Sequence, residues 1–446
     1  MAGQRQVTAA RRVVAELARH LDADLAVELW NGDVLPIGAG GLDDVRLVIG
    51  SAAAMKRLLL KPSISTIAEL FAIGEIDVRG PDLIEAMQRI DPTQFRALPR
   101  KVNKVALLKA ALPILLHRGK LSESGLEYKN EVASRSDDGR PDTDLIRFHY
   151  DVSNAFYALF LDPEMVYSSA YFERPDTTLD EAQKAKLDLI CRKLRLQPGE
   201  RLFDLGCGWG SLLCHAAQTY GVHAFGTTLS QAQFDYVTAK IDRLGLKDRV
   251  TVELRDCRTV DEPGAFDKIA QVEMIEHLGL DNHDAHYKRM RALLRPRGLY
   301  FGQASTRRVT PDISRFRKMT VYTRFGTRFI FPGGELDYIG MTVTNLERHG
   351  FEVLDVEALR EHFQLTCEHW ARRLYDRREA AAAEVGWPRT RLWYLYLSIC
   401  AIAFERGTLN VFQVVGSKRR VGPSGVPLDR ALLYPAARAG RRQPAV

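Results

Sequence analysis

Short apolar runs alternate with helical patterns along the second part of the chain. The runs are rich in β-branched and aromatic residues, as strands are, and they cover residues 201–205, 223–227, 250–254, 266–272, 299–304 and 351–356. Between them apolar residues recur at a spacing of three and four, as in an amphipathic helix, at residues 231–244, 283–294 and 342–349. This alternation predicts an α/β fold with a doubly wound, mainly parallel sheet.

The first part of the chain has a different pattern. Helical spacing links Val13, Val14, Leu17 and Leu21. Apolar runs at 25–29 and 45–49 flank Asn31-Gly32 in a strand-turn-strand pattern, and helix-like segments follow at 53–60 and 67–73, with Gly74 and Gly80 as stops. This order predicts a small α+β domain.

A polar stretch separates these two patterns. It includes residues 134–141 and lacks the apolar side chains that a folded core needs. We therefore expect an N-terminal domain over 1–121, a linker over 122–144 and a second domain over 145–416. Within the second domain, residues 306–339 place arginines among aromatic residues, and we interpret them as an insertion over the functional site.

Charge and cysteine content narrow the class of protein. The net charge is +7, and residues 417–446 hold seven Lys or Arg against one Asp, a balance of +6. We expect this tail to be disordered; a basic tail suits an anionic membrane surface or nucleic acid, and a simply solvated tail explains it equally well. The six cysteines lack C-x-x-C pairing and the density of a disulfide framework, which fits reduced thiols in a cytoplasmic protein.

No segment has the pattern of an export signal or a membrane span. Charged residues interrupt the apolar positions at the N-terminus, so we expect no signal peptide. The longest uncharged apolar run, residues 392–404, is shorter than the about 20 residues that cross a bilayer. We expect it to be a buried helix.

Three glycines at alternate positions follow the apolar run 201–205. They are Gly206, Gly208 and Gly210 in Asp204-Leu-Gly-Cys-Gly-Trp-Gly. Glycine lets the backbone turn sharply and lets a ligand approach closely, and the absence of the later glycine of a dinucleotide motif favours S-adenosylmethionine. Asp204 is placed to accept from the ammonium group of that ligand or from loop N–H groups, or to cap the next helix.

Polar residues also follow the next two predicted strands. Thr228 and Gln233 supply a hydroxyl and an amide where many nucleotide folds have a ribose-binding acid, while Ser230 is equally a helix N-cap. Asp256 and Cys257 follow the third strand, where an acid can accept from an adenine amino group. We expect these residues to bind the cofactor.

Aromatic residues and two carboxylates complete the candidate site. The aromatics lie at 149–157 and 167–172, and they serve either as core or as a shield for a sulfonium or carbocation. Glu273 and Glu276 lie three apart after the fourth strand, beside His277, and burial would tune such a pair toward base chemistry. His283 and His286 have no cysteine or matching spacing nearby, so we expect no metal.

Together these pieces resemble the cyclopropane-fatty-acyl-phospholipid synthase family of methyltransferases over about residues 147–416. The residues that carry the resemblance are His149-Tyr150-Asp151 with Asn154, Tyr167-Ser168, the Asp204 loop, Thr228-Leu-Ser-x-x-Gln233, Asp256, Glu273-Met-Ile-Glu276-His277, Cys400 within 398–404, and Val411-Phe-Gln-Val-Val415. The resemblance implies a class I S-adenosylmethionine methyltransferase fold that acts on double bonds of acyl chains in membrane phospholipids.

The resemblance also implies a particular chemistry. The alkene attacks the methyl group of the sulfonium and leaves a carbocation, from which a base removes a proton to close a three-membered ring. Ring-forming relatives hold bicarbonate as that base, between a cysteine, the glutamate matching Glu276, a histidine and a tyrosine. In this chain Ser169, Gln303 and Phe363 replace the cysteine, the histidine and the tyrosine.

These three departures make a bicarbonate site doubtful. Phenylalanine has no donor, and neutral glutamine lacks the charge of an imidazolium, while Glu276 repels an anion. The carboxylates of Glu276 and Glu273 are then the candidate bases, and the product is either a cyclopropane or a methyl-branched or methylene chain. Cys400 matches a cysteine once considered a nucleophile in the family, and core packing explains it better.

We therefore expect Tyr167, Ser168, Asp204, the three glycines, Thr228, Gln233, Asp256 and Cys257 to bind S-adenosylmethionine. The insertion and the basic tail would face anionic lipid at the inner membrane surface. The alternatives are methylation of a soluble metabolite, or a catalytically weak protein that binds S-adenosylmethionine or lipid. No base-flipping motif is present, so nucleic acid is not an expected partner, and a homodimer is left open.

Overall fold

The computed structural model describes residues 2–21, 23–37, 44–80, 82–119, 121, 152–313, 316–430 and 433. The predicted linker 122–144, the motif His149-Tyr150-Asp151 and residues 434–446 of the predicted tail lie outside these ranges. The chain forms two compact units. The first comprises Met1–Asp138, Arg317–Pro332 and Cys367–Ala403, and the second comprises Gly139–Phe316, Gly333–Thr366 and Phe404–Val446.

The first unit is built around a four-stranded sheet in the order β2-β1-β3-β4, in which β1 and β3 are parallel and the outer pairs are antiparallel. Its N-terminal elements are α1 (Ala2–Ala18), β1 (Leu25–Leu29), β2 (Val34–Ile37), β3 (Arg46–Ile49), α2 (Ala52–Leu60), α3 (Ile64–Ala72), β4 (Ile76–Arg79), α4 (Leu83–Gln88), α5 (Pro92–Lys101) and α6 (Lys104–Leu115). Strand β2 was missing from the prediction, because its short run Val-Leu-Pro-Ile follows the turn directly.

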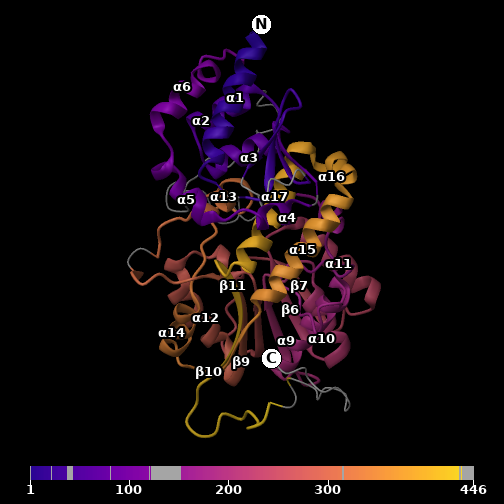
Figure 1. Ribbon diagram of the computed structural model, residues 1–446. Coiled ribbons are helices and arrows are strands. Elements are labelled where there is room, and N and C mark those ends of the chain that lie inside the picture. The colour runs from indigo at the N-terminus through magenta and orange to yellow at the C-terminus, as the bar shows by residue number, and fades with distance from the viewer. Residues whose placement is uncertain are drawn as a thin grey trace, which may run out of the picture. The chain divides into compact units, whose positions relative to one another are not determined.

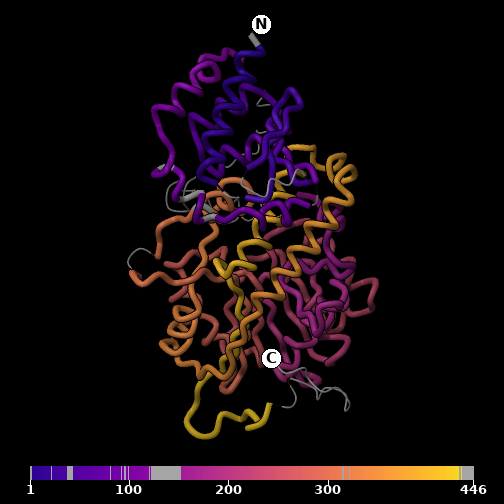
Figure 2. Tube along the Cα trace, viewed as in Figure 1, coloured from indigo at the N-terminus to yellow at the C-terminus, as the bar shows by residue number. Residues whose placement is uncertain are grey.

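Helices from late in the sequence complete this first unit. They are α13 (Val321–Phe329), the last part of α15 (Arg360–Asp376), α16 (Arg378–Val385) and α17 (Trp387–Glu405) up to Ala403. Figure 2 shows these orange segments beside the indigo N-terminal chain. Arg391 of α17 donates to the carbonyls of Phe71 and Ile76, at 2.5 and 3.0 Å. Arg328 of α13 pairs with Glu69 at 2.9 Å.

The compact units therefore have other boundaries than the predicted domains 1–121 and 145–416. Part of the predicted insertion 306–339 and the predicted buried helix at 392–404 group with the N-terminal residues. Two arginines of the insertion also make internal contacts. Arg328 pairs with Glu69, and the guanidinium of Arg307 lies 4.2 Å from the ring centroid of Phe316 within the second unit.

The second unit contains a seven-stranded sheet in the order β10-β11-β9-β8-β5-β6-β7 (Figure 1). The strands are β5 (Arg201–Leu205), β6 (His223–Thr228), β7 (Val250–Leu254), β8 (Phe266–Val272), β9 (Leu294–Arg307), β10 (Phe351–Ala358) and β11 (Leu409–Lys418). Strands β5 to β9 run parallel, and β11 pairs antiparallel with both β9 and β10. The predicted doubly wound, mainly parallel sheet is confirmed.

Helices cover both faces of this sheet because its strand residues are apolar in both directions. Leu202 of β5 joins one buried cluster and Phe203 the other. The helices are α8 (Asn154–Ala158), α9 (Leu179–Leu194), α10 (Ser211–Tyr220), α11 (Gln231–Leu244), α12 (His283–Leu293) and α14 (Ile339–Arg348), with 3₁₀ turns η1 (Cys257–Thr259), η2 (Ile275–His277) and η3 (Leu280–Asn282). The carboxyl ends of β5, β6 and β8 thereby meet at one edge of the sheet.

The predicted tail begins inside a strand rather than in disordered chain. Residues 417 and 418 belong to β11, and Arg430 donates to Asp355 of β10 at 2.8 Å. Within the part of the chain that the structure describes, no helix combines the length and the apolar character needed to cross a membrane.

Candidate active site

The glycine loop joins the end of β5 to the start of α10. Gly206, Gly208 and Gly210 all have left-handed backbones, with φ of +69°, +53° and +74°, which only glycine adopts without cost. A Cβ on Gly206 would lie 2.8 Å from Cγ of Met274, whereas one on Gly208 would meet nothing within 4 Å. The loop is thus tightly held on one side and faces open space on the other.

A pocket extends from this loop along the carboxyl ends of the strands. Most of the predicted cofactor-binding residues line it together: Tyr167, Ser168, Asp204, Gly206, Gly208, Thr228, Gln233, Asp256 and Cys257. Gly210 does not line it, because it is the N-cap of α10 and its Cα side faces Val237 of α11. A glycine cradle with carboxylate, hydroxyl and amide groups around it fits an adenosyl sulfonium such as S-adenosylmethionine.

A buried lysine balances the carboxylates of this pocket. Nζ of Lys186 donates to Oγ of Ser168 at 2.7 Å. Burial lowers the pKa of Lys186 to about 8, against the charges of Glu273, Asp162 and Asp204, which raise it. Burial likewise raises the pKa of Asp204 to about 7, against the nearby ammonium of Lys186. Lys186 therefore lies among three acids, of which Asp204 and Glu273 line the pocket with it.

The polar groups after β6 are paired with one another. Oγ1 of Thr228 donates to Oε1 of Gln233 at 2.7 Å, and both side chains are buried. Ser230 accepts from the backbone N–H of Gln233 and is the N-cap of α11, as the capping alternative predicted. The Thr228 to Gln233 bond holds a hydroxyl and an amide at the wall of the pocket.

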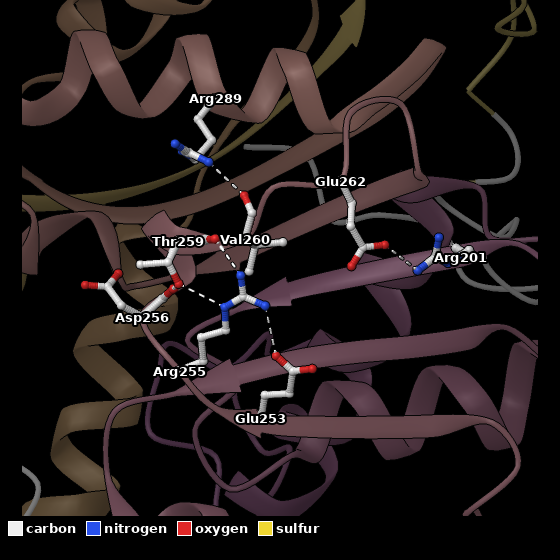
Figure 3. A network of polar contacts seen from close by, with 8 residues as sticks. All are labelled: Arg201, Glu253, Arg255, Asp256, Thr259, Val260, Glu262 and Arg289. Carbon is white, nitrogen blue, oxygen red and sulfur yellow. Dashed lines mark hydrogen bonds and ion pairs between the residues drawn. The ribbon is translucent and has the colours of Figure 1, made fainter.

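Asp256 is engaged by a neighbouring arginine. Its carboxylate caps η1 and pairs with Arg258 at 2.6 Å. Burial opposes ionisation, but the hydrogen bonds from Arg258 keep the pKa of Asp256 below its usual value. Arg255 fixes the same turn by donating to Thr259 at 2.9 Å and to Glu253 at 3.3 Å (Figure 3). The predicted adenine acceptor is thus a charged carboxylate in a braced turn.

Glu273 sits in a strained backbone conformation at the end of β8. Its φ is +49°, a region that non-glycine residues rarely adopt. Oε1 accepts from the backbone N–H of Ser169 at 2.9 Å and from Nε2 of Gln303 at 2.8 Å. Gln303 in turn accepts from Nε2 of Gln413 at 2.9 Å. Burial raises the pKa of Glu273 to about 6, against these two donors.

Glu276 lies on η2 and is also buried. Oε1 accepts from the backbone N–H of Ser305 at 2.7 Å, while Oε2 is buried without a hydrogen-bond partner among the described residues. Burial raises the pKa of Glu276 to about 8, and the charge of Glu273 adds to the rise. A buried carboxylate with one unpaired oxygen is suited to hold or accept a proton near neutral pH.

The other predicted catalytic residues have structural contacts of their own. Oγ of Ser169 donates to the carbonyl of Ala170 at 3.2 Å. The ring of Phe363 stacks on Phe404, with centroids 4.5 Å apart. Cys400 lies on α17 in the first unit, and burial raises the pKa of its thiol to about 12, so the nucleophilic thiolate form is rare at neutral pH. This agrees with the packing role.

An aromatic cluster stands beside the glycine loop. Tyr157 packs against Tyr167 and Trp209, with centroids 5.4 and 4.9 Å apart. Nε1 of Trp209 donates to Asn154 at 2.8 Å. The cluster thus joins Asn154 and Tyr167, which the sequence motifs singled out, to the loop.

The two histidines considered for a metal have other surroundings. His286 shares a hydrogen bond of 2.7 Å with Gln271, and burial lowers its pKa to about 3. Among the described residues, no three His, Cys, Asp or Glu side chains are grouped as a metal site.

Two contributors to the site were missed from the sequence. Lys186 occurs in a helix whose buried face also includes Ala182 and Ile190, and a lysine at an apolar helical position is a signal that could have identified it. Gln413 occupies a completely buried place in β11, and its relation to Gln303 depends on strand pairing over more than a hundred residues.

Comparisons with known proteins identify the family of the chain. A family model described as mycolic acid cyclopropane synthetase matches residues 137–414. A probable fatty acid methyltransferase from Pseudomonas putida is 34% identical over 417 residues, which is 93% of this chain and 97% of that protein. A probable fatty acid methyltransferase from Mycobacterium tuberculosis is 37% identical over 64% of each chain.

Solved structures show the same relationship. Cyclopropane synthase MmaA2 from Mycobacterium tuberculosis is 33% identical with a TM-score of 0.59, covering 63% of this chain and all of that one. Mycolic acid cyclopropane synthase CmaA1, solved with S-adenosylhomocysteine, is 34% identical with the same TM-score and coverage. The resemblance inferred from the motifs is confirmed. The chain belongs to the mycolic acid cyclopropane synthetase family and is an S-adenosylmethionine-dependent C-methyltransferase.

Proposed function

We propose that this enzyme transfers a methyl group to the cis double bond of unsaturated acyl chains in membrane phospholipids. The names of its relatives, which include fatty acid methyltransferases and cyclopropane synthases, support an acyl substrate. The observation that carries the proposal is a pair of carboxylates with raised pKa values: Glu273 is half-buried and lines the glycine-loop pocket, and Glu276 is buried three residues further on. Alkylation of an alkene leaves a carbocation that must lose a proton to give a neutral product, so the reaction requires a base shielded from water.

The cofactor-binding residues hold and orient the donor in this proposal. S-adenosylmethionine supplies an electrophilic methyl group when it is bound. Asp204 and Ser168 face its charged amino-acid end, and Lys186 sets the charge balance there. Thr228, Gln233 and Asp256 line the part of the pocket assigned to the adenosine.

The aromatic cluster shields the cation that alkylation creates. Tyr157, Tyr167 and Trp209 present ring faces and edges to one another close to the loop. Desolvated aromatic faces stabilise a cation by roughly 1 to 2 kcal/mol. The same apolar walls keep water from adding to the carbocation.

Glu276 accepts the proton in this scheme, and Glu273 holds its partner groups in place. Glu276 has a buried unpaired oxygen among the described residues and a pKa raised to about 8, so its ionised form, which is a strong carboxylate base, increases as pH rises toward 8. Glu273 uses one oxygen to bind Ser169 and Gln303. We assign the proton transfer to Glu276 and the orientation of the site to Glu273.

The hydrogen bonds of Gln303 support a base other than bicarbonate. Its amide nitrogen is directed at Glu273 and its oxygen accepts from Gln413. Phe363 offers no polar atom and is stacked on Phe404. At the positions that would bind bicarbonate in ring-forming relatives, Gln303 is thus neutral and already hydrogen-bonded, and Phe363 is apolar. We propose that the carboxylates replace the ion, and that the product is a cyclopropane or a methyl-branched or methylene chain.

Labelled lipids test this proposal. The protein is expressed in a host without such lipids, fed with methionine whose methyl group carries deuterium, and the fatty acids are analysed by mass spectrometry. A ring or a methylene group retains two deuterium atoms, because the base removes one from the transferred methyl group. A methyl branch beside a shifted double bond retains three, because the base removes a proton of the chain instead. Proton NMR then separates ring from methylene. The proposal is contradicted if cells that express the wild-type protein contain no labelled fatty acids. It is also contradicted if the protein is fully active on a soluble acceptor and inactive on lipid.

A variant pair tests the base. Glu276→Gln should abolish labelled product and still bind S-adenosylmethionine in calorimetry, because Glu276 does not line the donor pocket. Glu262→Gln, which neutralises a half-exposed carboxylate paired with Arg201, is the matched control and should keep wild-type turnover. Wild-type turnover in Glu276→Gln would remove this residue from the mechanism.

A further inference from the structure

Helix α6 of the first unit is apolar on two opposite faces. The inner face packs through Ala111 and Ile114 into the buried core, with Leu107 partly covered. The outer face presents Val105, Leu108, Leu112 and Leu116, whose exposed fractions are 63%, 60%, 51% and 70%. Their spacing of three, four and four places all four on one stripe of the helix.

Such a stripe is unusual for a protein surface. Single exposed apolar residues need no explanation, but a contiguous row marks a contact with a partner or a membrane. Four large aliphatic side chains aligned on one helix form such a row. What covers the stripe must therefore be identified from its surroundings.

The chain segment that contains the stripe carries only basic charges. Residues 92–121 contain seven Lys or Arg and no Asp or Glu: Arg96, Arg100, Lys101, Lys104, Lys109, Arg118 and Lys120. Of these, Arg100, Lys101, Lys104, Lys109 and Arg118 have exposed side chains in the structure. Within α6, Lys104 occurs four positions before Leu108, and Lys109 occurs four positions after Val105 and three before Leu112, so both lysines neighbour the stripe.

We propose that α6 lies on the surface of an anionic lipid bilayer, with Val105, Leu108, Leu112 and Leu116 inserted below the headgroups. An apolar stripe with Lys and Arg beside it is the pattern of an interfacial helix, and lysine side chains extend to the phosphates while their stems stay apolar. The helix has 12 residues, too few for the about 20 that cross a bilayer, so it lies in the surface. This inference deepens the proposed function, since it names the surface through which the enzyme reaches its lipid.

This surface differs from the insertion and the tail that the sequence suggested. Arg307 and Arg328 of the insertion are engaged with Phe316 and Glu69. Arg430 of the tail is engaged with Asp355. In helix α6, labelled in Figure 1, a row of four exposed apolar side chains occurs together with exposed lysines.

Vesicle sedimentation with the full chain tests the inference. The vesicles are made of saturated phosphatidylglycerol and phosphatidylcholine, so that binding is measured without an alkene to methylate. Leu108→Gln/Leu112→Gln should weaken binding at least tenfold, because two inserted side chains lose their apolar contact. Lys101→Gln/Lys104→Gln/Lys109→Gln should weaken it about a hundredfold at low salt, at about fivefold for each basic residue.

Val421→Gln/Leu428→Gln is the matched control, since both residues are fully exposed and lie outside helices and strands. It should bind vesicles like wild type. Equal binding by the α6 variants, or an equal loss in the control, would overturn the inference. The inference would also be overturned if an α6 variant changed from dimer to monomer in analytical ultracentrifugation and still bound vesicles like wild type. In that case a second copy of the chain would cover the stripe.

The outcome is separable from that of the proposed function. Vesicle binding that depends on α6, without any labelled acyl product, leaves the docking surface intact and rejects the lipid substrate. Labelled acyl product together with vesicle binding that does not depend on α6 supports the lipid substrate and rejects the docking surface. Far-ultraviolet circular dichroism of each variant checks that α6 and its core contacts remain folded.

Discussion

Burial is the main cause of the shifted pKa values of the ionisable residues in the site. Asp204 and Glu276 are buried and Glu273 is half-buried, and the buried Lys186 lies near Asp204 and Glu273. Burial raises the pKa of each acid toward neutrality. The protein thus holds groups that can exchange a proton at physiological pH, where an exposed Asp or Glu is fully ionised.

The pKa of Glu276 predicts how stability depends on pH. Its pKa is raised from 4.5 to about 8 in the folded protein, so between these values the folded state binds a proton that the unfolded state has released. Stability that comes from this proton is present at low pH and is lost as pH rises through the folded pKa. The free energy of unfolding of Glu276→Gln should therefore gain on wild type as pH rises from about 5 to 8, by at most about 1.4 kcal/mol per pH unit.

Urea unfolding at several pH values measures this difference. Glu262→Gln serves as the control, and its difference from wild type should stay nearly constant over the same range. A constant difference for Glu276→Gln as well would mean that folding does not raise the pKa of Glu276, so that the carboxylate is ionised in both states over this pH range.

At the scale of elements, periodicity predicted the second unit well. The strands at 201–205, 250–254 and 266–272 and the helix at 231–244 have the predicted bounds. Strand β9 is longer than predicted, since it runs from Leu294 to Arg307 and includes charged residues at both ends. Strand β11 was noticed only as a motif, because a strand that pairs antiparallel between β9 and β10 is recognised by its partners and not by its own pattern.

The loop between β5 and α10 gives a prediction that separates strain from ligand contact. Gly206→Ala introduces a Cβ 2.8 Å from Cγ of Met274 in a left-handed backbone at the pocket wall. It should weaken S-adenosylmethionine binding at least tenfold in calorimetry and destabilise the fold. Gly199→Ala has φ of +81° and open space around the new Cβ, so it should cost about 1 to 2 kcal/mol of stability and leave binding unchanged. Equal effects on binding would mean that the Gly206 side of the loop does not shape the pocket.

At the scale of the whole molecule, two units built from separated segments were not visible in the sequence. The sequence suggested one domain after another, since local patterns carry no information about contacts between residues three hundred positions apart. Arg391 binding the carbonyl of Phe71 and Leu83 binding the hydroxyl of Tyr394 are contacts of this kind. The site residues were easier to predict, because most of them follow consecutive strands that end at the same edge.

The shared first unit predicts the behaviour of a fragment. A chain of residues 145–446 keeps α13 and α17 but removes the N-terminal groups that they contact, including Glu69 and Phe71. It should bind the dye ANS and elute as aggregates in size-exclusion chromatography, unlike the full chain. Co-expression with residues 1–121 should restore a monodisperse complex. A monodisperse fragment with wild-type thermal unfolding would show that α13 and α17 do not depend on the N-terminal residues.

The left-handed backbone of Glu273 sets the stability of the fold against the function of the site. Glycine would relieve that conformation, which costs an ordinary residue about 1 to 2 kcal/mol. Glu273→Gly would therefore attract any screen that selects only for heat resistance, while removing the acceptor that anchors Ser169 and Gln303. Thermostability and the hydrogen bonds of the site are therefore in opposition at this position.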